Sequence, residues 1–85
     1  DLDGIVNQLR ITKGVKAAVF IYELSDKEYK VSLRANGDVN VSRAAAVFGG
    51  GGHIKAAGCT LRGELSEELP KLISEVDKSI KEAGE

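Results

Sequence analysis

The alternation of apolar and polar positions predicts two adjacent strands in the first half of the chain. Residues 15–24 (VKAAVFIYEL) are apolar on both alternating sets, which is typical of a strand inside a sheet. Residues 29–35 (YKVSLRA) alternate cleanly, so one set of side chains faces the core and the other faces away. The polar residues 25–28 between them indicate a hairpin turn. This pattern places Arg34 on the polar face, at the far end of the second strand.

Two helices and a third strand are predicted in the second half. Residues 41–48 (VSRAAAVF) predict a helix of about two turns. Residues 65–83 carry a continuous apolar stripe with charges on the remaining surface, and they predict the last helix. Between these helices, residues 56–62 (AAGCTLR) predict a strand in which Cys59 is a small buried residue.

The first residues of the chain match a helix. Its apolar residues fall at the spacing of one helical face: Leu2, Ile5, Val6 and Leu9. We expect Gly14 to end this segment, residues 1–14 to be a helix or linker from a missing catalytic domain, and residues 15–85 to form the folded domain. The chain begins at Asp1 rather than Met, so we expect a piece of a longer protein.

The predicted elements follow one another as helix, strand, strand, helix, strand, helix. This order predicts an α/β fold, a single compact domain with a small mixed β-sheet of three or more strands flanked by helices. The length of 85 residues fits one domain, and the 42% of hydrophobic residues is ordinary for a globular protein. With two Phe, two Tyr and no Trp or Met, the core is small and aliphatic. Support from another domain or a homodimer is therefore left open.

Charge and cysteine content narrow the functional classes. The net charge is −1, whereas a protein that grips long nucleic acids usually has a strongly basic surface. A nucleotide-binding role would thus involve one or two phosphates at a defined place. The single cysteine excludes an internal disulfide and a cysteine-based metal cluster. No apolar run reaches the roughly 20 residues that span a bilayer, and no signal-peptide pattern is present, so we expect a cytoplasmic location away from membranes.

Residues 48–59 (FGGGGHIKAAGC) are the one unusual stretch. The four glycines could form a flexible connector or a tight turn, or they could let backbone N–H groups approach an anion as in phosphate loops. The run lacks the Gly-Lys-Ser/Thr ending of a Walker motif, and it follows a helix rather than the strand of a Rossmann fingerprint. Taken alone, the glycines favour the connector.

His53 changes this balance. It is the only histidine and directly follows the glycines, where a ring N–H could donate to a phosphate oxygen, and Lys55 adds positive charge. It cannot ligate a metal alone, and no nucleophile–base pair surrounds it. Arg34 is its expected partner, because a helix of about 12 Å hardly carries the chain back along a strand of about 23 Å. The glycines would then lie near the Arg34 end, where a guanidinium can form bidentate bonds to a phosphate.

Residues 31–61 (VSLRANGDVNVSRAAAVFGGGGHIKAAGCTL) resemble the C-terminal, DHH-associated domain of DHH-family phosphoesterases. The resemblance lies in the branch that holds oligoribonuclease/pAp-phosphatase, exopolyphosphatase-related and cyclic-di-AMP phosphodiesterase enzymes. It covers about residues 15–80. Its most specific part is the glycine run followed by His and then Ala-Ala-Gly.

The resemblance implies a division of labour within a longer protein. A missing N-terminal domain with an Asp-His-His motif would hold two manganese ions and activate water, and this chain would grip a nucleotide or a short single-stranded oligonucleotide. The chain itself would supply neither catalytic residues nor metal ligands. The positions that match the family's substrate-binding residues are Arg34, Gly50, Gly51, Gly52 and His53. Ala35 stands where the family often has Ser, so a contact from that hydroxyl would be lost.

Two other classes of function are considered. One is a tRNA-binding or dimerisation module, because alanyl-tRNA synthetases carry a related C-terminal domain with a similar glycine stretch. The other is a non-catalytic regulatory ligand-binding domain of ferredoxin-like type. His53 after the glycines favours the phosphoesterase domain over the tRNA module, and the low net charge disfavours a large RNA. The regulatory class predicts no Arg or His near the glycine run.

Overall fold

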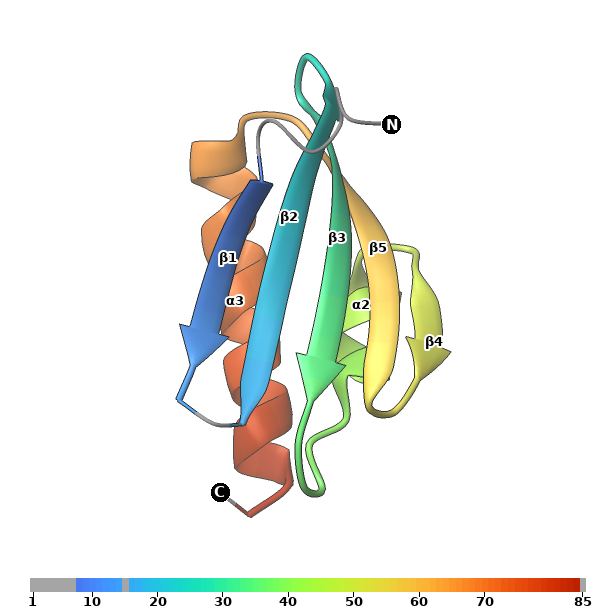
Figure 1. The fold of residues 1–85 in the computed structure, drawn as a ribbon, viewed down its shortest axis with the longest axis vertical. Coiled ribbons are helices and arrows are strands. Elements are labelled where there is room, and N and C mark those ends of the chain that lie inside the picture. The colour runs from blue at the N-terminus through green and yellow to red at the C-terminus, as the bar shows by residue number, and fades with distance from the viewer. Residues whose placement is uncertain (1–7, 15, 85) are drawn as a thin grey trace.

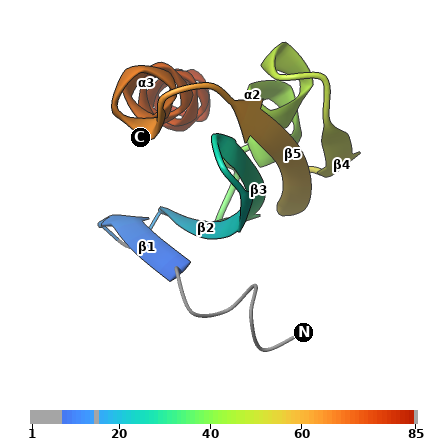
Figure 2. The same cartoon turned by 90° about the horizontal axis from the view of Figure 1, so that it is seen from above.

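A computed structural model describes residues 8–14 and 16–84 of the chain. They form a five-stranded sheet in the order β1-β2-β3-β5-β4, with both helices on one side of it (Figures 1 and 2). The strands are β1 (Gln8–Lys13), β2 (Ala17–Ser25), β3 (Glu28–Ala35), β4 (Gly51–His53) and β5 (Ala56–Arg62). The helices are α2 (Val41–Val47) and α3 (Leu65–Glu82). The predicted α/β class and single compact domain are confirmed.

The sheet is antiparallel at all four pairings between these strands, whereas the sequence predicted a mixed sheet. The difference comes from β4. A strand, a helix and a second strand in succession usually give a parallel pair. Here β4 intervenes after α2, and a two-residue turn reverses the chain before β5 begins. As a result β5 runs antiparallel to β3.

The predicted helix near the N-terminus is wrong for residues 8–13, which form β1. The first part of that helix, residues 1–7, lies outside the described residues. β1 pairs with β2 along its whole length, from Gln8 opposite Tyr22 to Lys13 opposite Ala17. Main-chain hydrogen bonds to β2 outweigh the local helical spacing of the apolar residues. Residues 8–13 are therefore part of the sheet.

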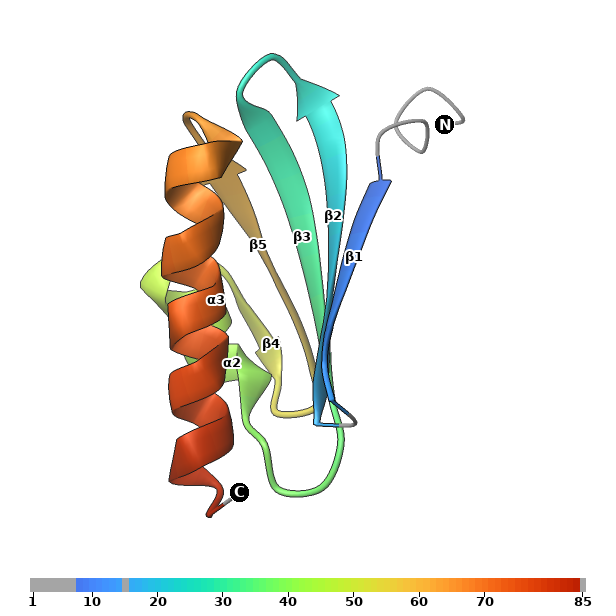
Figure 3. The same cartoon turned by 90° about the vertical axis from the view of Figure 1, so that its left-hand side faces the viewer.

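The hydrophobic core lies between the sheet and the two helices (Figure 3). Alternate residues of the strands point into it, as shown by Val19 on β2 and Leu33 on β3, which are both fully buried. Leu72 and Val76 on α3 close it from the other side. Each such aliphatic side chain contributes about 1.5–3 kcal/mol through its removal from water. Cys59 is buried here as well, as predicted.

The other set of alternating side chains points away from the helices. We call this surface the open face. Its residues on β2 to β5 are Ala18, Phe20, Tyr22, Glu28, Lys30, Ser32, Arg34, Gly51, His53, Ala56, Gly58, Thr60 and Arg62.

Candidate functional site

Arg34 and His53 lie in one row across the sheet. Arg34 on β3 is opposite Ala56 on β5, and His53 on β4 is opposite the same Ala56. Directly opposite residues of antiparallel strands place their side chains on the same face, so both belong to the open face. Two strand spacings separate their Cα atoms by about 10 Å. The structure thus brings together the two side chains predicted from the sequence to share a phosphate, with only a methyl group between them.

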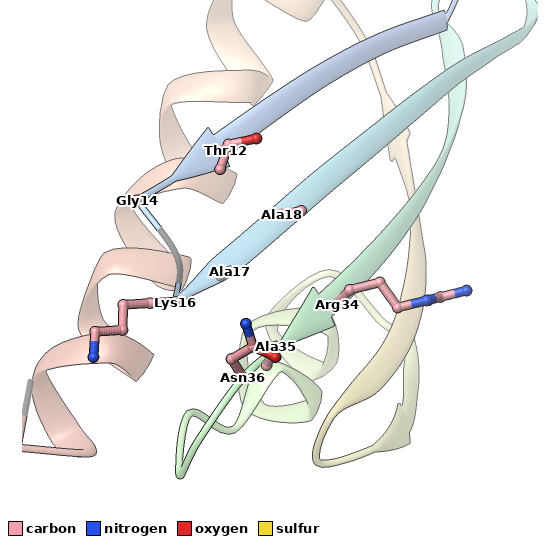
Figure 4. A pocket seen from close by; sticks show the side chains of 8 residues that line it. All are labelled: Thr12, Gly14, Lys16, Ala17, Ala18, Arg34, Ala35 and Asn36. Carbon is pink, nitrogen blue, oxygen red and sulfur yellow. The ribbon is translucent and has the colours of Figure 1, made fainter.

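The Arg34 side chain is exposed and directed toward this space. Figure 4 shows it extending from β3 away from Lys16 and Asn36, toward the side on which β5 runs. One guanidinium nitrogen donates to the carbonyl oxygen of Leu33 at 3.0 Å. A guanidinium carries five N–H donors, so this bond leaves donors for a ligand.

His53 is placed by the turn that joins β4 to β5. Ile54 and Lys55 form this turn, and main-chain bonds fix it on two sides. The N–H of Ala35 donates to the carbonyl of Lys55 at 3.0 Å, and the N–H of Val41 donates to the carbonyl of Ile54 at 2.8 Å. The first bond ties the turn to the end of β3, and the second ties it to the start of α2. These two bonds attach the hairpin that carries His53 to β3 and α2. His53 and Lys55 are both exposed.

The first two glycines of the run end helix α2. Gly49 has a φ of 81°, and the N–H of Gly50 donates to the carbonyl of Ala45 at 2.9 Å, which together form a Schellman motif. A Cβ on Gly50 would lie 2.0 Å from the carbonyl oxygen of Gly58. Helix termination and close packing explain these residues. Because the N–H of Gly50 already donates to Ala45, it is not free to bind a phosphate. Of the predicted phosphate loop, only the residues of β4 remain as candidates.

The glycines of β4 differ from each other. Gly52 has a φ of 142°, and a Cβ there would lie 2.7 Å from the carbonyl oxygen of Ala56. Gly51 has no such restriction: its φ is not positive, and a Cβ would meet nothing within 4 Å. Gly51 lies opposite Gly58 on the open face. These two residues leave a strip of bare backbone next to the row of Arg34 and His53, although the fold does not require glycine at position 51.

A hollow of about 240 Å³ lies on the β2 side of Arg34 (Figure 4). Ala18 and Thr12 continue the row of Arg34 onto β2 and β1. Arg34 thus stands between two alanines, Ala18 and Ala56. Thr12 could not be found from the sequence, because its segment matched a helix rather than an edge strand of this sheet. His53 does not line this hollow.

The described residues offer no metal centre or reactive thiol. In residues 8–14 and 16–84, no three His, Cys, Asp or Glu side chains are grouped as metal ligands. Burial raises the pKa of the Cys59 thiol to about 11, so this group stays protonated at neutral pH. No helix in this part of the chain is long and apolar enough to cross a membrane.

Comparison with known proteins finds similar enzymes that are much longer. The chain is 34% identical over 85 residues to the bifunctional oligoribonuclease and PAP phosphatase NrnA of Thermus thermophilus, which covers 99% of this chain and 26% of that protein. NrnA of Mycoplasma pneumoniae is 34% identical over 62 residues, covering 73% and 18%. The A-adding tRNA nucleotidyltransferase of Geobacter sulfurreducens is 27% identical over 84 residues, covering 89% and 10%. The chain thus spans about a quarter or less of these relatives.

Structure and family comparisons agree with this. An exopolyphosphatase-related protein from Bacteroides fragilis superposes with a TM-score of 0.70 at 29% identity, covering 87% of this chain and 22% of that one. The sequence model of the DHHA1 domain matches residues 1–82. The chain therefore belongs to the DHHA1 domain family, as its resemblance to the C-terminal domain of DHH-family phosphoesterases predicted.

Proposed function

We propose that this chain is the substrate-binding part of a DHH-family phosphoesterase and grips one phosphate of a nucleotide between Arg34 and His53. The observation that carries the proposal is their shared pairing with Ala56. A phosphate above the small Ala56 side chain is within reach of the guanidinium from one strand and of the imidazole from another. Charge-assisted hydrogen bonds from such groups are the strong ones, and guanidinium can bind two phosphate oxygens at once.

The bare backbone at Gly51 and Gly58 supports the same proposal. If the phosphate of a ligand lies above Ala56, other atoms of that ligand lie over the adjacent row of the sheet, which contains Gly51 and Gly58. Since neither position of that row carries a side chain on β4 or β5, the ligand can approach the peptide planes closely. Ligand binding would therefore explain why glycine stands at position 51, which the packing of the fold does not explain.

The metal chemistry belongs to another domain in this proposal. Manganese ions on an Asp-His-His domain of the same protein would supply the Lewis acid and the attacking hydroxide. This chain contributes positioning, which keeps a neighbouring phosphate in line for the reaction. Nucleotides and short single-stranded oligonucleotides are the proposed ligands, in line with the names of the NrnA relatives. The proposal places the protein in the cytoplasm.

Two further classes of function are less well supported. The similarity to an A-adding tRNA nucleotidyltransferase would favour an RNA-binding module. Its sequence identity to this chain is lower than that of the NrnA relatives, however. A regulatory domain of ferredoxin-like type gives no reason for an arginine and a histidine in one row beside the glycines. The substrate-binding role accounts for this row directly.

Nucleotide titration of the 85-residue chain tests the proposal. A 5′-mononucleotide followed by NMR should shift the amide signals of Arg34, Gly51, His53 and Ala56. Arg34→Ala and His53→Ala should each raise Kd by about tenfold, which corresponds to the loss of one charge-assisted hydrogen bond. Lys71→Ala is the control, since Lys71 is an exposed cation on α3, on the other side of the sheet.

Two results would oppose the substrate-binding role. One is a native chain that binds no nucleotide, or whose affinity is the same in Arg34→Ala, His53→Ala and Lys71→Ala. The other is phosphodiesterase activity of the chain alone with manganese, because that would place the catalytic groups here. We expect no hydrolysis.

A further inference from the structure

β1 has a partner strand on one side only. It is the first strand in the sheet order β1-β2-β3-β5-β4, and within residues 8–14 and 16–84 it pairs with β2 alone. Its pairing with β2 runs from Gln8 to Lys13 without a shift of register. The N–H and C=O groups on the outer side of such a strand can bond to a further strand. We call this outer side the β1 edge.

The two edges of the sheet differ in how well they can accept a further strand. β4 has three residues, Gly51–His53, and glycine weakens a strand. Short length, proline and bulges are usual ways in which proteins protect a sheet edge. β1 has six residues, no proline and no break in its register. The β1 edge is therefore the one suited to pairing with another chain.

A partly uncovered apolar flank of α3 lies above the same edge. Figures 1 and 2 show α3 over the β1 side of the sheet and α2 over the β5 side. Glu82 faces α2, since its carboxylate pairs with Arg43. Ile73 and Ile80 precede Glu82 by nine and two residues, which places them about 180° and 160° around the helix from it, away from α2. Together with Leu69 they form what we call the α3 flank, and all three are only partly buried.

A second copy of the chain, related by a two-fold axis perpendicular to the sheet, would cover both surfaces at once. Such an axis reverses the strand direction, so the two β1 edges pair antiparallel. It also keeps the helices of both copies on the same side of the joined sheet, and the two α3 flanks then lie beside each other. A single peptide strand from another protein would pair with the β1 edge but leave the α3 flank uncovered. The combined surface therefore fits a second copy better.

The charges of β1 select the register of this pairing. Five residues of each strand can pair when either Arg10 or Ile11 lies on the two-fold axis. With Arg10 on the axis, the two copies of Arg10 are opposite each other, and like charges in this position destabilise a sheet. With Ile11 on the axis, Arg10 is opposite Thr12 of the second copy. Leu9 is then opposite Lys13, so no two cations are opposite each other, and this register is favoured.

The size of the contact predicts a weak dimer. The paired part of β1 and the α3 flank together supply about eight residues from each copy. An interface of standard size uses about 20–30 residues from each partner and buries about 800 Å² on each. The contact is roughly a third of that size, which is typical of transient complexes. We therefore expect a dimer Kd on the order of 100 µM.

We propose that two copies of this chain associate through the β1 edge and the α3 flank, with Ile11 on the two-fold axis. The two five-stranded sheets then form one continuous sheet. The second copy covers apolar surface next to a core that is small and aliphatic. This contact lies at the opposite end of the sheet from β4 and uses neither Arg34 nor His53. It is therefore independent of the proposed function.

Sedimentation equilibrium of the 85-residue chain between about 10 µM and 1 mM tests this inference. The mean mass should rise with concentration from that of one chain toward that of two. Thr12 is exposed and lies opposite Arg10 of the second copy in the favoured register. Thr12→Lys should therefore raise the dimer Kd by about tenfold, and Thr12→Glu should lower it by about three- to tenfold. Adding Arg10→Glu to Thr12→Lys restores opposite charges and should return the Kd to the native value or below.

Ser74→Lys and Ser74→Glu are the matched controls. Ser74 is an exposed polar residue of α3 that lies outside the α3 flank, so these variants add the same charges away from the contact. They should leave the dimer Kd unchanged. Circular dichroism verifies that each variant is folded. Ile73→Ala tests the α3 flank separately and should raise the dimer Kd, because it removes apolar surface from the contact.

Amide hydrogen exchange shows which surface is used. The outward N–H groups of β1 should exchange more slowly at about 1 mM than at about 10 µM, whereas the amides of β4 should not change. A chain that stays monomeric at about 1 mM overturns the inference. So does a dimer that protects β4 rather than β1, or one whose Kd responds equally to the Thr12 and Ser74 variants. An unchanged Kd in Ile73→Ala overturns the part assigned to the α3 flank.

Discussion

Arg34 and His53, on strands that are not neighbours, stand opposite the same residue, Ala56. The β4–β5 hairpin creates this relationship by folding the chain back so that His53 returns to the level of the end of β3. Its turn is bonded through the main chain to Ala35 and to Val41. The relative position of the Cα atoms of Arg34 and His53 is therefore set by main-chain hydrogen bonds rather than by flexible loops.

Replacing Arg34 by Lys should weaken nucleotide binding almost as much as replacing it by Ala. An ammonium keeps the charge but loses the planar fork that binds two phosphate oxygens. We expect a Kd about three- to tenfold higher than that of the native chain, an effect of about 1 kcal/mol, by titration calorimetry with a mononucleotide. Since the side chain is exposed, the free energy of unfolding should change by less than about 0.5 kcal/mol. Native affinity in Arg34→Lys would mean that only its charge is used.

The glycines should separate into structural and ligand-facing positions. Gly51→Ala adds a methyl group in open space, so we expect nearly unchanged stability in urea unfolding but weaker nucleotide binding. Gly50→Ala drives a methyl group into the backbone of β5 and should destabilise the fold by about 1–3 kcal/mol or more. Gly52→Ala should also destabilise it, because of its φ of 142° and its close contact with β5. Equal stability loss at positions 50 and 51, or full affinity in Gly51→Ala, would contradict this division.

The sequence predicted those elements whose pattern is local. The segment of β2 is a continuous apolar run, β3 and β5 alternate, and α3 has a continuous apolar stripe, so each was found close to its observed bounds. β4 is Gly51–His53 and has no apolar side chain, so only its pairing with β5 reveals it. The predicted mixed sheet follows from missing this strand. β1 was missed for a related reason, since pairing with β2 decides its conformation and the local spacing suited a helix.

The candidate site could likewise be predicted only where the pattern is local. Alternation placed Arg34 on the polar face, and the position after the glycine run singled out His53. The structural role of Gly50 depends on the carbonyl of Gly58, which the sequence alone does not place beside it.

Cys59 should react slowly and only through unfolding. Its thiol is buried, and desolvation raises its pKa to about 11 from an ordinary value of 9.0. We expect slow modification by a thiol reagent at pH 8 in the native chain and fast modification in urea. A folded pKa above the unfolded one means that the contribution to stability is present below about pH 9 and is lost between about pH 9 and 11. Cys59→Ala should therefore lose less stability over this range than the native chain, and a parallel decline in both would contradict the role of the thiol.

Shortening Leu72 should destabilise the fold much more than shortening Val47. Leu72 is fully buried between α3 and the sheet, so Leu72→Ala leaves a cavity and should lower the free energy of unfolding by about 2–5 kcal/mol. Val47 is 60% exposed on α2, and Val47→Ala should change it by less than about 0.5 kcal/mol. Urea unfolding measures both, and the slope of the transition should stay the same if the unfolded state is unchanged. A similar loss for both variants would mean that α3 adds little to the core. Because the core and the open face are on opposite sides of the sheet, Leu72→Ala should still bind a mononucleotide with native affinity wherever it remains folded.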